Sequence, residues 1–247
     1  SPQIRSEPIK TAIAEIPLRK INTFLMANRV LNDRELENAP RIVAGKNERF
    51  ILGEGDIAYI KGTLDTSVNS YSIYQKGKEY IDPNTQQVIG VQAINLGNAQ
   101  IRSIEQEVSS LTINKSRQEI TTRDNVRVLP SIEKVITSTF LPTPPETTVE
   151  GEIISIESGL SLVGRLDIVS INLGSRQGME KGSLLGIYQS GIIVRDRLAK
   201  QGENYKIQLP DERAGLLMVF ETLERMSFAI VLEATVGVRL GDRVGNP

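Results

Sequence analysis

The chain has 247 residues, of which 39% are hydrophobic and 24% are charged, with a formal net charge of −1. This composition indicates a soluble globular protein of one large domain or two small ones. The near-neutral charge removes any electrostatic case for binding nucleic acid, and no apolar run approaches the ~20 residues of a membrane span.

The chain contains neither Cys nor His. Their absence excludes Ser/His/Asp and Cys/His nucleophilic catalysis, histidine acid–base work and every zinc site with His or thiolate ligands. Carboxylate chemistry, Ser/Lys chemistry or no chemistry remain. No catalytic, cofactor-binding or metal-binding residue is assigned, and no cofactor is expected.

Two features bear on the compartment. Lack of Cys is compatible with an oxidising envelope compartment, where a free thiol is a liability, and the alternative is a cytosolic protein that lacks Cys by chance. The chain begins at Ser1 rather than at Met. We therefore expect a processed or trimmed piece that has lost a signal peptide or a further domain.

Residues 1–40 are predicted to form an extended arm and short helices. The first ~15 residues show no hydrophobic period. After Pro17, which is tolerated in a first helical turn, apolar residues recur at helical spacing. These residues are Leu18, Ile21, Phe24 and Leu25. The following "DRELENA" predicts a second helical turn that is capped at its start by Asp33.

From residue 41 onward the pattern changes to short segments rich in Ile, Val and Tyr and bounded by turn residues, which is typical of β-strands. The run "ITSTFLPTPPETTVEG" interrupts this pattern and predicts an extended, semi-rigid linker. The chain thus divides into a first β repeat (residues 41–136), a Pro/Thr linker (137–148) and a second β repeat (149–247).

The two β segments repeat one another in order. "DIAYIKG" (56–62) matches "DIVSINLG" (167–174), and "YSIYQKG" (71–77) matches "LLGIYQSG" (184–191). A duplicated unit of this size predicts a small barrel or sandwich that pairs with its twin. The expected fold class is therefore mainly β, with a short helical N-terminal segment followed by two homologous small β-barrel or sandwich modules.

The duplication predicts specific equivalences. Asp56 should superpose on Asp167, Tyr74 on Tyr188 and Asp124 on Asp242. In the stretch "SINLGSRQGMEKGSLLGIYQSG" (170–191), glycine recurs too often for a helix, so we expect these glycines to close turns between strands. They are Gly174, Gly178, Gly182, Gly186 and Gly191. The apolar residues beside them are predicted to fill the core, namely Ile187, Ile192 and Val194.

Two motifs resemble catalytic signatures. "SIEK" (Ser131–Lys134) fits the Ser-x-x-Lys pattern of penicillin-recognising enzymes, with "SVN" (67–69) and "KGT" (61–63) as the further elements. Their order is reversed and the helical subdomain is absent, so a chance match is the preferred interpretation. "GLSLVGR" (159–165) is one residue short of a P-loop, and Leu166 stands where Ser or Thr must hold magnesium, which favours a strand and turn.

Carboxylates are the remaining enzymatic option, because a glycosidase needs two of them ~5 to 9.5 Å apart. The acids here are mostly in caps, loops or Gly-Asp turns, where Asp bonds its own backbone. Four tyrosines of the first repeat could instead form a binding surface, although their alternation with polar residues favours half-buried strand packing. These tyrosines are Tyr59, Tyr71, Tyr74 and Tyr80.

The run "IPLRKINTFLMANRVLNDRELENAPRIVAG" (16–45), followed by "GEGDIAYIKG", "GSRQGMEKGSLLGIYQSG" and "LGDRVG", resembles the region after the LysM module in bacterial LysM-domain envelope proteins. These Gram-negative proteins have a signal peptide, one peptidoglycan-binding LysM module and a long tail. The resemblance covers nearly the whole chain but not LysM itself, so no glycan-binding residue is transferred. The first repeat has Arg123–Asp124 where the second has Gly241–Asp242. This departure puts the turn of the first repeat in doubt, because Arg does not readily adopt positive φ.

The resemblance implies a non-enzymatic component of the periplasm or cell envelope. A LysM module outside this chain would hold it to peptidoglycan, and the present part would serve as a spacer, scaffold or docking unit for an unidentified envelope protein. Two alternatives stay open. One is a peptidoglycan hydrolase that uses Asp or Glu, and the other is a small-ligand or ion-binding module.

Overall fold

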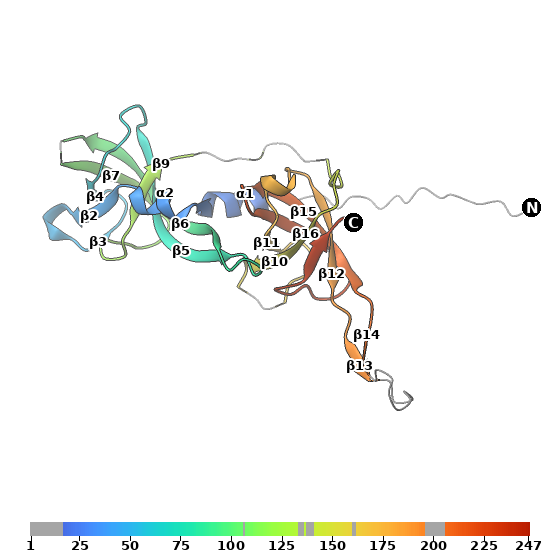
Figure 1. Ribbon diagram of the computed structural model, residues 1–247. Helices are drawn as coiled ribbons and strands as arrows, with labels where there is room; N and C mark the ends of the chain where they lie inside the picture. The colour runs from blue at the N-terminus through green and yellow to red at the C-terminus, as the bar shows by residue number, and fades with distance from the viewer. Residues whose placement is uncertain (1–16, 106, 133–135, 137–140, 160–161, 196–205) are drawn as a thin grey trace, which may run out of the picture.

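The computed structural model describes residues 17–105, 107–132, 136, 141–159, 162–195 and 206–247. The predicted extended arm at residues 1–16 lies outside this part of the chain. The fold is mainly β, with a short helical segment followed by two barrels (Figure 1). The predicted fold class is therefore confirmed.

The first barrel lies between Arg41 and Pro130. Its strands are β2 (Arg41–Gly45), β4 (Ile57–Lys61), β5 (Ser70–Ile81), β6 (Val88–Ser103), β7 (Val108–Ser116) and β9 (Arg127–Pro130). They are hydrogen-bonded in the order β2-β4-β7-β6-β5-β9, and β9 returns to β2. Smaller elements are η1 (Lys46–Glu48) and the pair β3 (Ile51–Leu52) and β8 (Ile120–Thr121). Buried residues such as Ile60, Ile73 and Leu111 fill the interior.

The second barrel lies between Glu150 and Gly245. Its strands are β10 (Glu150–Ile156), β11 (Ile168–Ile171), β12 (Leu184–Gln189), β15 (Glu212–Thr222), β16 (Ser227–Ala234) and β17 (Arg243–Gly245), with η2 (Ser175–Gln177) between β11 and β12. They close in the order β10-β11-β16-β15-β12-β17. Ile153, Ile187 and Leu217 are among its buried core residues.

The two barrels have the same topology. Numbered by position within each barrel, both follow the order 1-2-5-4-3-6. Both also need glycine at the same bulge between the third and fourth strands, where a side chain would strike the next strand. A Cβ on Gly97 would lie 2.2 Å from the Lys115 carbonyl oxygen, and one on Gly215 would lie 2.1 Å from that of Glu233.

Two of the three predicted equivalences are confirmed. Asp56 accepts a hydrogen bond from the Gly53 amide at 3.0 Å, and Asp167 accepts one from the Gly164 amide at 3.1 Å. Tyr74 and Tyr188 each lie on the third strand of their barrel, directly after the point where the fourth strand bulges.

The predicted equivalence of Asp124 and Asp242 is wrong by two residues. Arg127 lies opposite Tyr74, as Arg243 lies opposite Tyr188, so these two arginines are equivalent. Asp242 then matches Val126, and Gly241 matches Asn125. Asn125 has φ 51° and Gly241 has φ 84°. The left-handed position is therefore occupied by Asn rather than Arg in the first barrel, and Asn tolerates that conformation.

The prediction that the glycines of 170–191 close turns is only partly right. Gly178 (φ 76°) and Gly182 (φ 100°) lie in turns, and Gly174 precedes η2. Gly186 instead lies within β12, where a Cβ would come within 2.8 Å of the Tyr188 side chain. Glycine is therefore needed at this position to leave room for the Tyr188 ring.

The core prediction holds for Ile187 alone, which is buried. Ile192 is 69% exposed, and Val194 is only partly buried on a hairpin that leaves the barrel. A run of apolar β-branched residues such as Ile192, Ile193 and Val194 is typical of a barrel strand and of such a hairpin alike, which accounts for the error.

The helical predictions are confirmed with one correction. α1 (Leu18–Ala27) begins after Pro17, and Ile21 is fully buried. α2 (Asp33–Asn38) is capped by Asn32, whose Oδ1 accepts from the Glu35 amide at 2.7 Å, rather than by Asp33. The strand β1 (Asn28–Leu31) between these helices was not predicted, and it pairs with β6 at residues 91–94.

The barrels share an apolar junction. The outer part of the β5–β6 hairpin and α1 extend from the first barrel onto the second (Figure 1). The edge of Phe24 packs against Phe228 with ring centroids 4.9 Å apart, and Tyr80 packs against Phe228 at 5.9 Å. The buried members of this cluster are Ile21, Tyr80, Ile168, Met218, Phe220, Met226, Phe228 and Ile230. The two barrels are thus joined through a core of their own.

Candidate functional site

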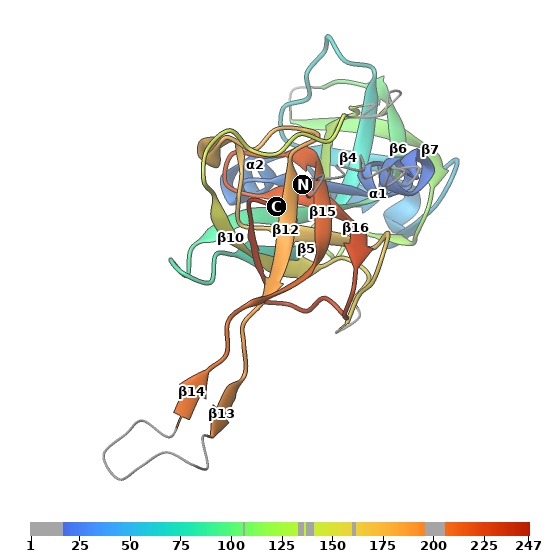
Figure 2. The same cartoon turned by 90° about the vertical axis from the view of Figure 1, so that its right-hand side faces the viewer.

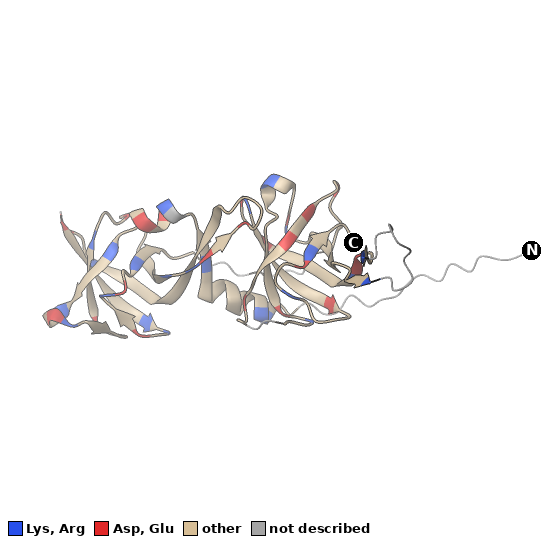
Figure 3. Ribbon diagram, turned by 60° about the horizontal axis from the view of Figure 1, so that its bottom comes forward, with Lys and Arg blue, Asp and Glu red and all other residues tan. Residues whose placement is uncertain are grey.

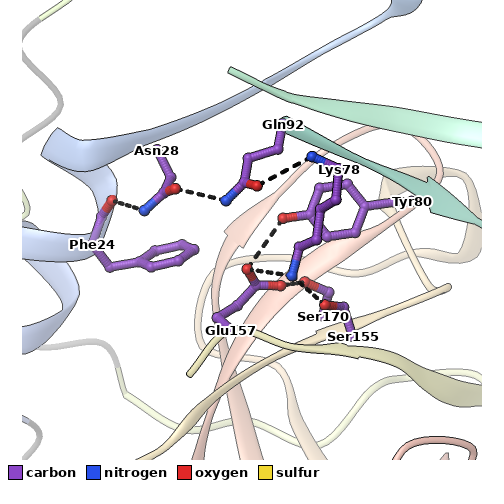
Figure 4. A network of polar contacts seen from close by, with 8 residues as sticks. All are labelled: Phe24, Asn28, Lys78, Tyr80, Gln92, Ser155, Glu157 and Ser170. Carbon is purple, nitrogen blue, oxygen red and sulfur yellow. Dashed lines mark hydrogen bonds and ion pairs between the residues drawn. The ribbon is translucent and has the colours of Figure 1, made fainter. Parts of the chain in front are cut away.

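A polar network crosses this junction (Figure 4). Glu157 follows β10, and its side chain is only 4% exposed. Its Oε1 accepts from the Ser170 hydroxyl at 2.6 Å, while Oε2 lies 3.0 Å from Lys78 Nζ and 3.3 Å from the Tyr80 hydroxyl. Lys78 Nζ also donates to the Ser155 hydroxyl. Because Lys78 and Tyr80 come from β5, the network ties the first barrel to the second.

The network continues toward α1. The Lys78 amide donates to Gln92 Oε1 at 3.4 Å, and Gln92 Nε2 donates to Asn28 Oδ1 at 2.7 Å (Figure 4). Asn28 Nδ2 in turn donates to the Phe24 carbonyl at 3.1 Å, close to where the helix ends. This chain of contacts fixes α1 to the β5–β6 hairpin that docks on the second barrel.

The electrostatics of the junction favour a structural role for its titratable groups. Burial raises the pKa of Tyr80, and the neighbouring Glu157 carboxylate raises it further, so the phenol stays protonated and donates. Both oxygens of Glu157 are occupied by donors from the protein. A buried carboxylate with this set of partners is stabilised in its position rather than presented to a substrate.

A cleft of about 560 Å³ lies between α1 and the second barrel and contains two carboxylates, Glu157 and Asp167. A hydrolase would need two acids in such a cleft. Asp167 Oδ1 is 3.3 Å from Lys20 Nζ, however, and Oδ2 closes the turn at Gly164. Asp56 makes the same turn contact in the first barrel, away from this cleft. The turn contact therefore belongs to the repeated fold.

The tyrosine binding surface considered from the sequence is not formed. Tyr71, Tyr74 and Tyr80 are buried, each in a different apolar cluster, and Tyr59 is half-buried on β4. The Tyr71 hydroxyl donates to the Asp65 carbonyl at 2.9 Å. The strand-packing interpretation of these residues is confirmed.

The described residues of the two motifs that resemble catalytic signatures lie in strands, turns, loops and bridges of the fold. The Ser131 hydroxyl contacts the hydroxyls of Ser70 at 3.1 Å and Ser72 at 3.0 Å, while Lys134 lies outside the described residues. In the P-loop-like stretch, residues 160–161 are likewise outside the described chain. Val163 forms a β-bridge with Val238, which fits the strand-and-turn interpretation. Within the described ranges, no group of three or more carboxylates is arranged to hold a metal ion.

A projecting hairpin was missed by the sequence analysis. The strands β13 (Ile193–Arg195) and β14 (Lys206–Gln208) pair with each other and extend away from the second barrel (Figure 2). The described part of this arm, residues 190–195 and 206–211, is hereafter the β13–β14 arm. Its exposed apolar residues are Ile192, Ile193, Ile207 and Leu209. The first repeat offered a signal, because its third and fourth strands also extend beyond their barrel.

The base of the arm is anchored. Gly191 approaches Leu209 so closely that a Cβ would lie 1.9 Å from the Leu209 carbonyl oxygen. The Gln208 side chain donates to the Gly191 carbonyl at 2.9 Å. Asp211 forms an ion pair with Arg243 on β17. The arm therefore leaves the barrel from a fixed base.

Elsewhere on the molecule, basic and acidic residues are interspersed along both barrels (Figure 3). No helix within the described ranges is both long and apolar enough to cross a membrane. The chain matches no protein-family model and no curated protein.

Proposed function

We propose that this chain is a non-catalytic docking region of a bacterial cell-envelope protein, and that its β13–β14 arm binds an apolar sheet face of a partner protein. The resemblance to LysM-type proteins supports a place in the periplasm of a Gram-negative cell, where a LysM module holds the protein to peptidoglycan. The observation that carries the docking role is the exposure of the arm, where Ile192 is 69% and Ile193 is 63% exposed.

A hairpin of this size is marginally stable in water by itself. Each of its strands is bonded to the other alone among the described strands, so each has a free edge. Free edges with exposed β-branched residues favour pairing with another chain. A partner whose apolar sheet face covers the isoleucines also gains main-chain hydrogen bonds where a strand of that face pairs with a free edge of the arm.

The repeat indicates how the arm is used. The arm leaves the second barrel directly after β12, between the third and fourth strands. This position is equivalent to the one at which the β5–β6 hairpin extends beyond the first barrel. That first extension docks on an apolar β surface, where Tyr80 is fully buried. The arm is thus an equivalent extension whose apolar side chains are left exposed.

A second copy of this chain lacks the matching surface on its first barrel. On the second barrel, the docking face has the apolar residues Ile168, Met218, Phe220, Phe228 and Ile230. By strand register, their equivalents on the first barrel are Ile57, Gln100, Arg102, Ser110 and Thr112. Because four of these five are polar, the arm fits a different protein rather than the next copy of this one.

The test places a photo-crosslinking residue at position 193 in the full chain, in cells. As a matched control, Ile51 on the first barrel is 60% exposed and receives the same residue. We expect position 193, but not position 51, to crosslink to one envelope protein. That protein, once purified, should bind the wild-type chain and lose at least about tenfold in affinity for Ile193→Asp.

Two results would contradict the proposal. One is equal crosslinking from positions 51 and 193. The other is a homodimer that Ile193→Asp dissociates in analytical ultracentrifugation, which would make a second copy the occupant. Because Ile193 is exposed, the substitution should leave the melting temperature unchanged, so loss of folding would not imitate loss of binding.

A further inference from the structure

The first barrel has a basic pocket of about 520 Å³ at the end where β2 and β9 meet. Arg41 is the first residue of β2, Arg127 is the first residue of β9, and Arg123 and Asn125 lie in the turn that precedes β9. Three arginines and one asparagine thus line a single pocket on a protein whose net charge is −1.

The arginines lack the counter-ions that such a cluster normally requires. Arg41 and Arg127 are direct cross-strand partners, a position at which like charges are destabilising. Within the described chain none of the three arginines forms an ion pair. Arg127 donates to the Ala39 carbonyl at 2.9 Å, and Arg123 lies over the Phe50 ring at 4.5 Å.

The pKa of Arg127 responds to this environment. Burial lowers it, and the neighbouring charge of Arg41 lowers it further, while Glu37 acts in the opposite direction. The Arg127 guanidinium nevertheless remains charged at neutral pH, because the reference pKa of Arg is so high. The repulsion between Arg41 and Arg127 is therefore present under physiological conditions.

The second barrel shows what the same backbone looks like when its charges are balanced. Arg243 is equivalent to Arg127, but its cross-strand partner is Glu152 in place of Arg41. Arg243 also forms ion pairs with Glu150 and Asp211. At the same place, the second barrel has an arginine in two ion pairs, whereas the equivalent Arg127 forms none within the described residues and has only one acid, Glu37, near enough to influence it.

Asn125 supplies a second difference between the barrels. It has φ 51°, a conformation that glycine adopts most easily, and the equivalent residue of the second barrel is Gly241. The first barrel thus retains a side chain at a position where a left-handed backbone favours none. Asn125 is one of the residues that line the pocket, and its side chain carries a neutral hydrogen-bond donor.

We propose that this pocket binds an oxyanion, the carboxylate or phosphate group of a small anionic ligand. Arg41 and Arg127 hold the oxyanion from opposite strands, Asn125 donates a neutral hydrogen bond, and Phe50 keeps the Arg123 guanidinium in place by stacking. Guanidinium groups match both oxyanions because two parallel N–H donors fit two oxygens. The bound anion replaces the acids that the second barrel builds into its own chain.

The test uses isothermal titration calorimetry of the full chain at low ionic strength, with inorganic phosphate and succinate as separate probes. We expect saturable binding of at least one of them. Binding of phosphate alone identifies phosphorylated ligands, and binding of succinate alone identifies carboxylates. Arg127→Gln should weaken the binding by about tenfold or more, since it removes a charge-assisted hydrogen bond. Arg239→Gln, at the equivalent of Arg123 in the second barrel, is the control and should leave it unchanged.

Arg41→Glu provides an independent readout, because it places an acid opposite Arg127, as Glu152 lies opposite Arg243 in the second barrel. It should abolish anion binding and raise the melting temperature by about 1–3 °C, as repulsion becomes attraction. Unchanged affinity in Arg127→Gln, an equal loss in Arg239→Gln, or no saturable binding of either probe would overturn the proposal. A lower melting temperature in Arg41→Glu would overturn the charge argument on which it rests.

Discussion

At the scale of single residues, the junction depends on one buried carboxylate. Glu157 accepts from Ser170 of its own barrel and from Lys78 and Tyr80 of the other. Burying a carboxylate costs several kcal/mol unless its charge and lone pairs are matched. A group suited to acid–base chemistry therefore serves here to fix the relative position of two barrels.

We expect Lys78→Met to lower the free energy of unfolding by about 1–2 kcal/mol, because it leaves Glu157 buried without its cation. The loss stays below that for a fully buried pair, since the Lys78 side chain is 38% exposed and water partly replaces it. Urea denaturation measures the change. Lys61→Met, at an exposed lysine of β4, is the control and should have little effect.

The double variant Lys78→Met/Glu157→Gln distinguishes the cause. If the buried charge is responsible, the double variant should be more stable than Lys78→Met alone, because the uncompensated charge is gone. A double variant that is no more stable would show that Lys78 acts through packing of its aliphatic stem rather than through the ion pair.

At the scale of elements, turns set by glycine position the strands. Gly182 has φ 100°, its amide donates to the Val219 carbonyl at 2.8 Å, and its carbonyl accepts from the Thr143 amide at 3.0 Å. The residue thus joins the segment before the second barrel to the turn that starts β12. A left-handed backbone conformation is what permits both bonds at once.

Gly182→Val should cost more than about 1 kcal/mol, because a β-branched residue is strained at positive φ. Thermal unfolding followed by circular dichroism measures the loss. Gly53→Ala is a matched control, since Gly53 lacks positive φ and a Cβ there would meet nothing within 4 Å. An equal loss in both variants would show that the conformation of Gly182 is not the cause, because lower entropy of the unfolded chain by itself stabilises the fold.

Elements with a period of their own were predictable from the sequence. The spacing of Leu18, Ile21 and Phe24 predicts α1, and the ordered β motifs predict two related modules. β1 was not predictable, because residues 28–31 become a strand only where β6 extends past the first barrel and offers an edge. The arm was misassigned because the consecutive apolar residues 192–194 carry no information on whether a second layer covers them.

The candidate sites were harder to predict from the sequence than the fold was. Matching identical aspartates, Asp124 and Asp242, displaced the register by two residues and concealed the pairing of Arg127 with Arg243. Without that equivalence, Arg41 and Glu152 cannot be recognised from the sequence as equivalent residues of opposite charge. The better guide was Asn125 against Gly241, since residues that tolerate positive φ mark equivalent turns.

At the scale of the whole molecule, the two barrels share a topology but differ in which of their surfaces are covered. The extension of the first barrel is buried in the junction, and that of the second is exposed as the β13–β14 arm. One barrel leaves its arginines unpaired, and the other neutralises the equivalent residue. If both proposals hold, the two barrels share their interior packing and differ in what their surfaces bind.

The last prediction concerns the chain and the cell wall. If a LysM module supplies the affinity for glycan, the 247-residue chain should stay in the supernatant when mixed with purified sacculi, and the same chain extended by a LysM module should pellet. The net charge of −1 and the interspersed surface charges give little nonspecific attraction to an anionic wall (Figure 3). Sedimentation followed by gel analysis measures the partition.

The sacculi should also remain chemically intact, because Glu157 and Asp167, the two carboxylates that share a cleft, are already bonded to Ser170, Lys78 and Lys20. Chromatography of the supernatant measures any muropeptides released. Release that Glu157→Gln or Asp167→Asn abolishes would establish a carboxylate-dependent hydrolase in place of the docking role. Pelleting without cleavage would instead locate a glycan-binding surface within these residues, and variants of the arm and of the arginine pocket would then show which surface it is.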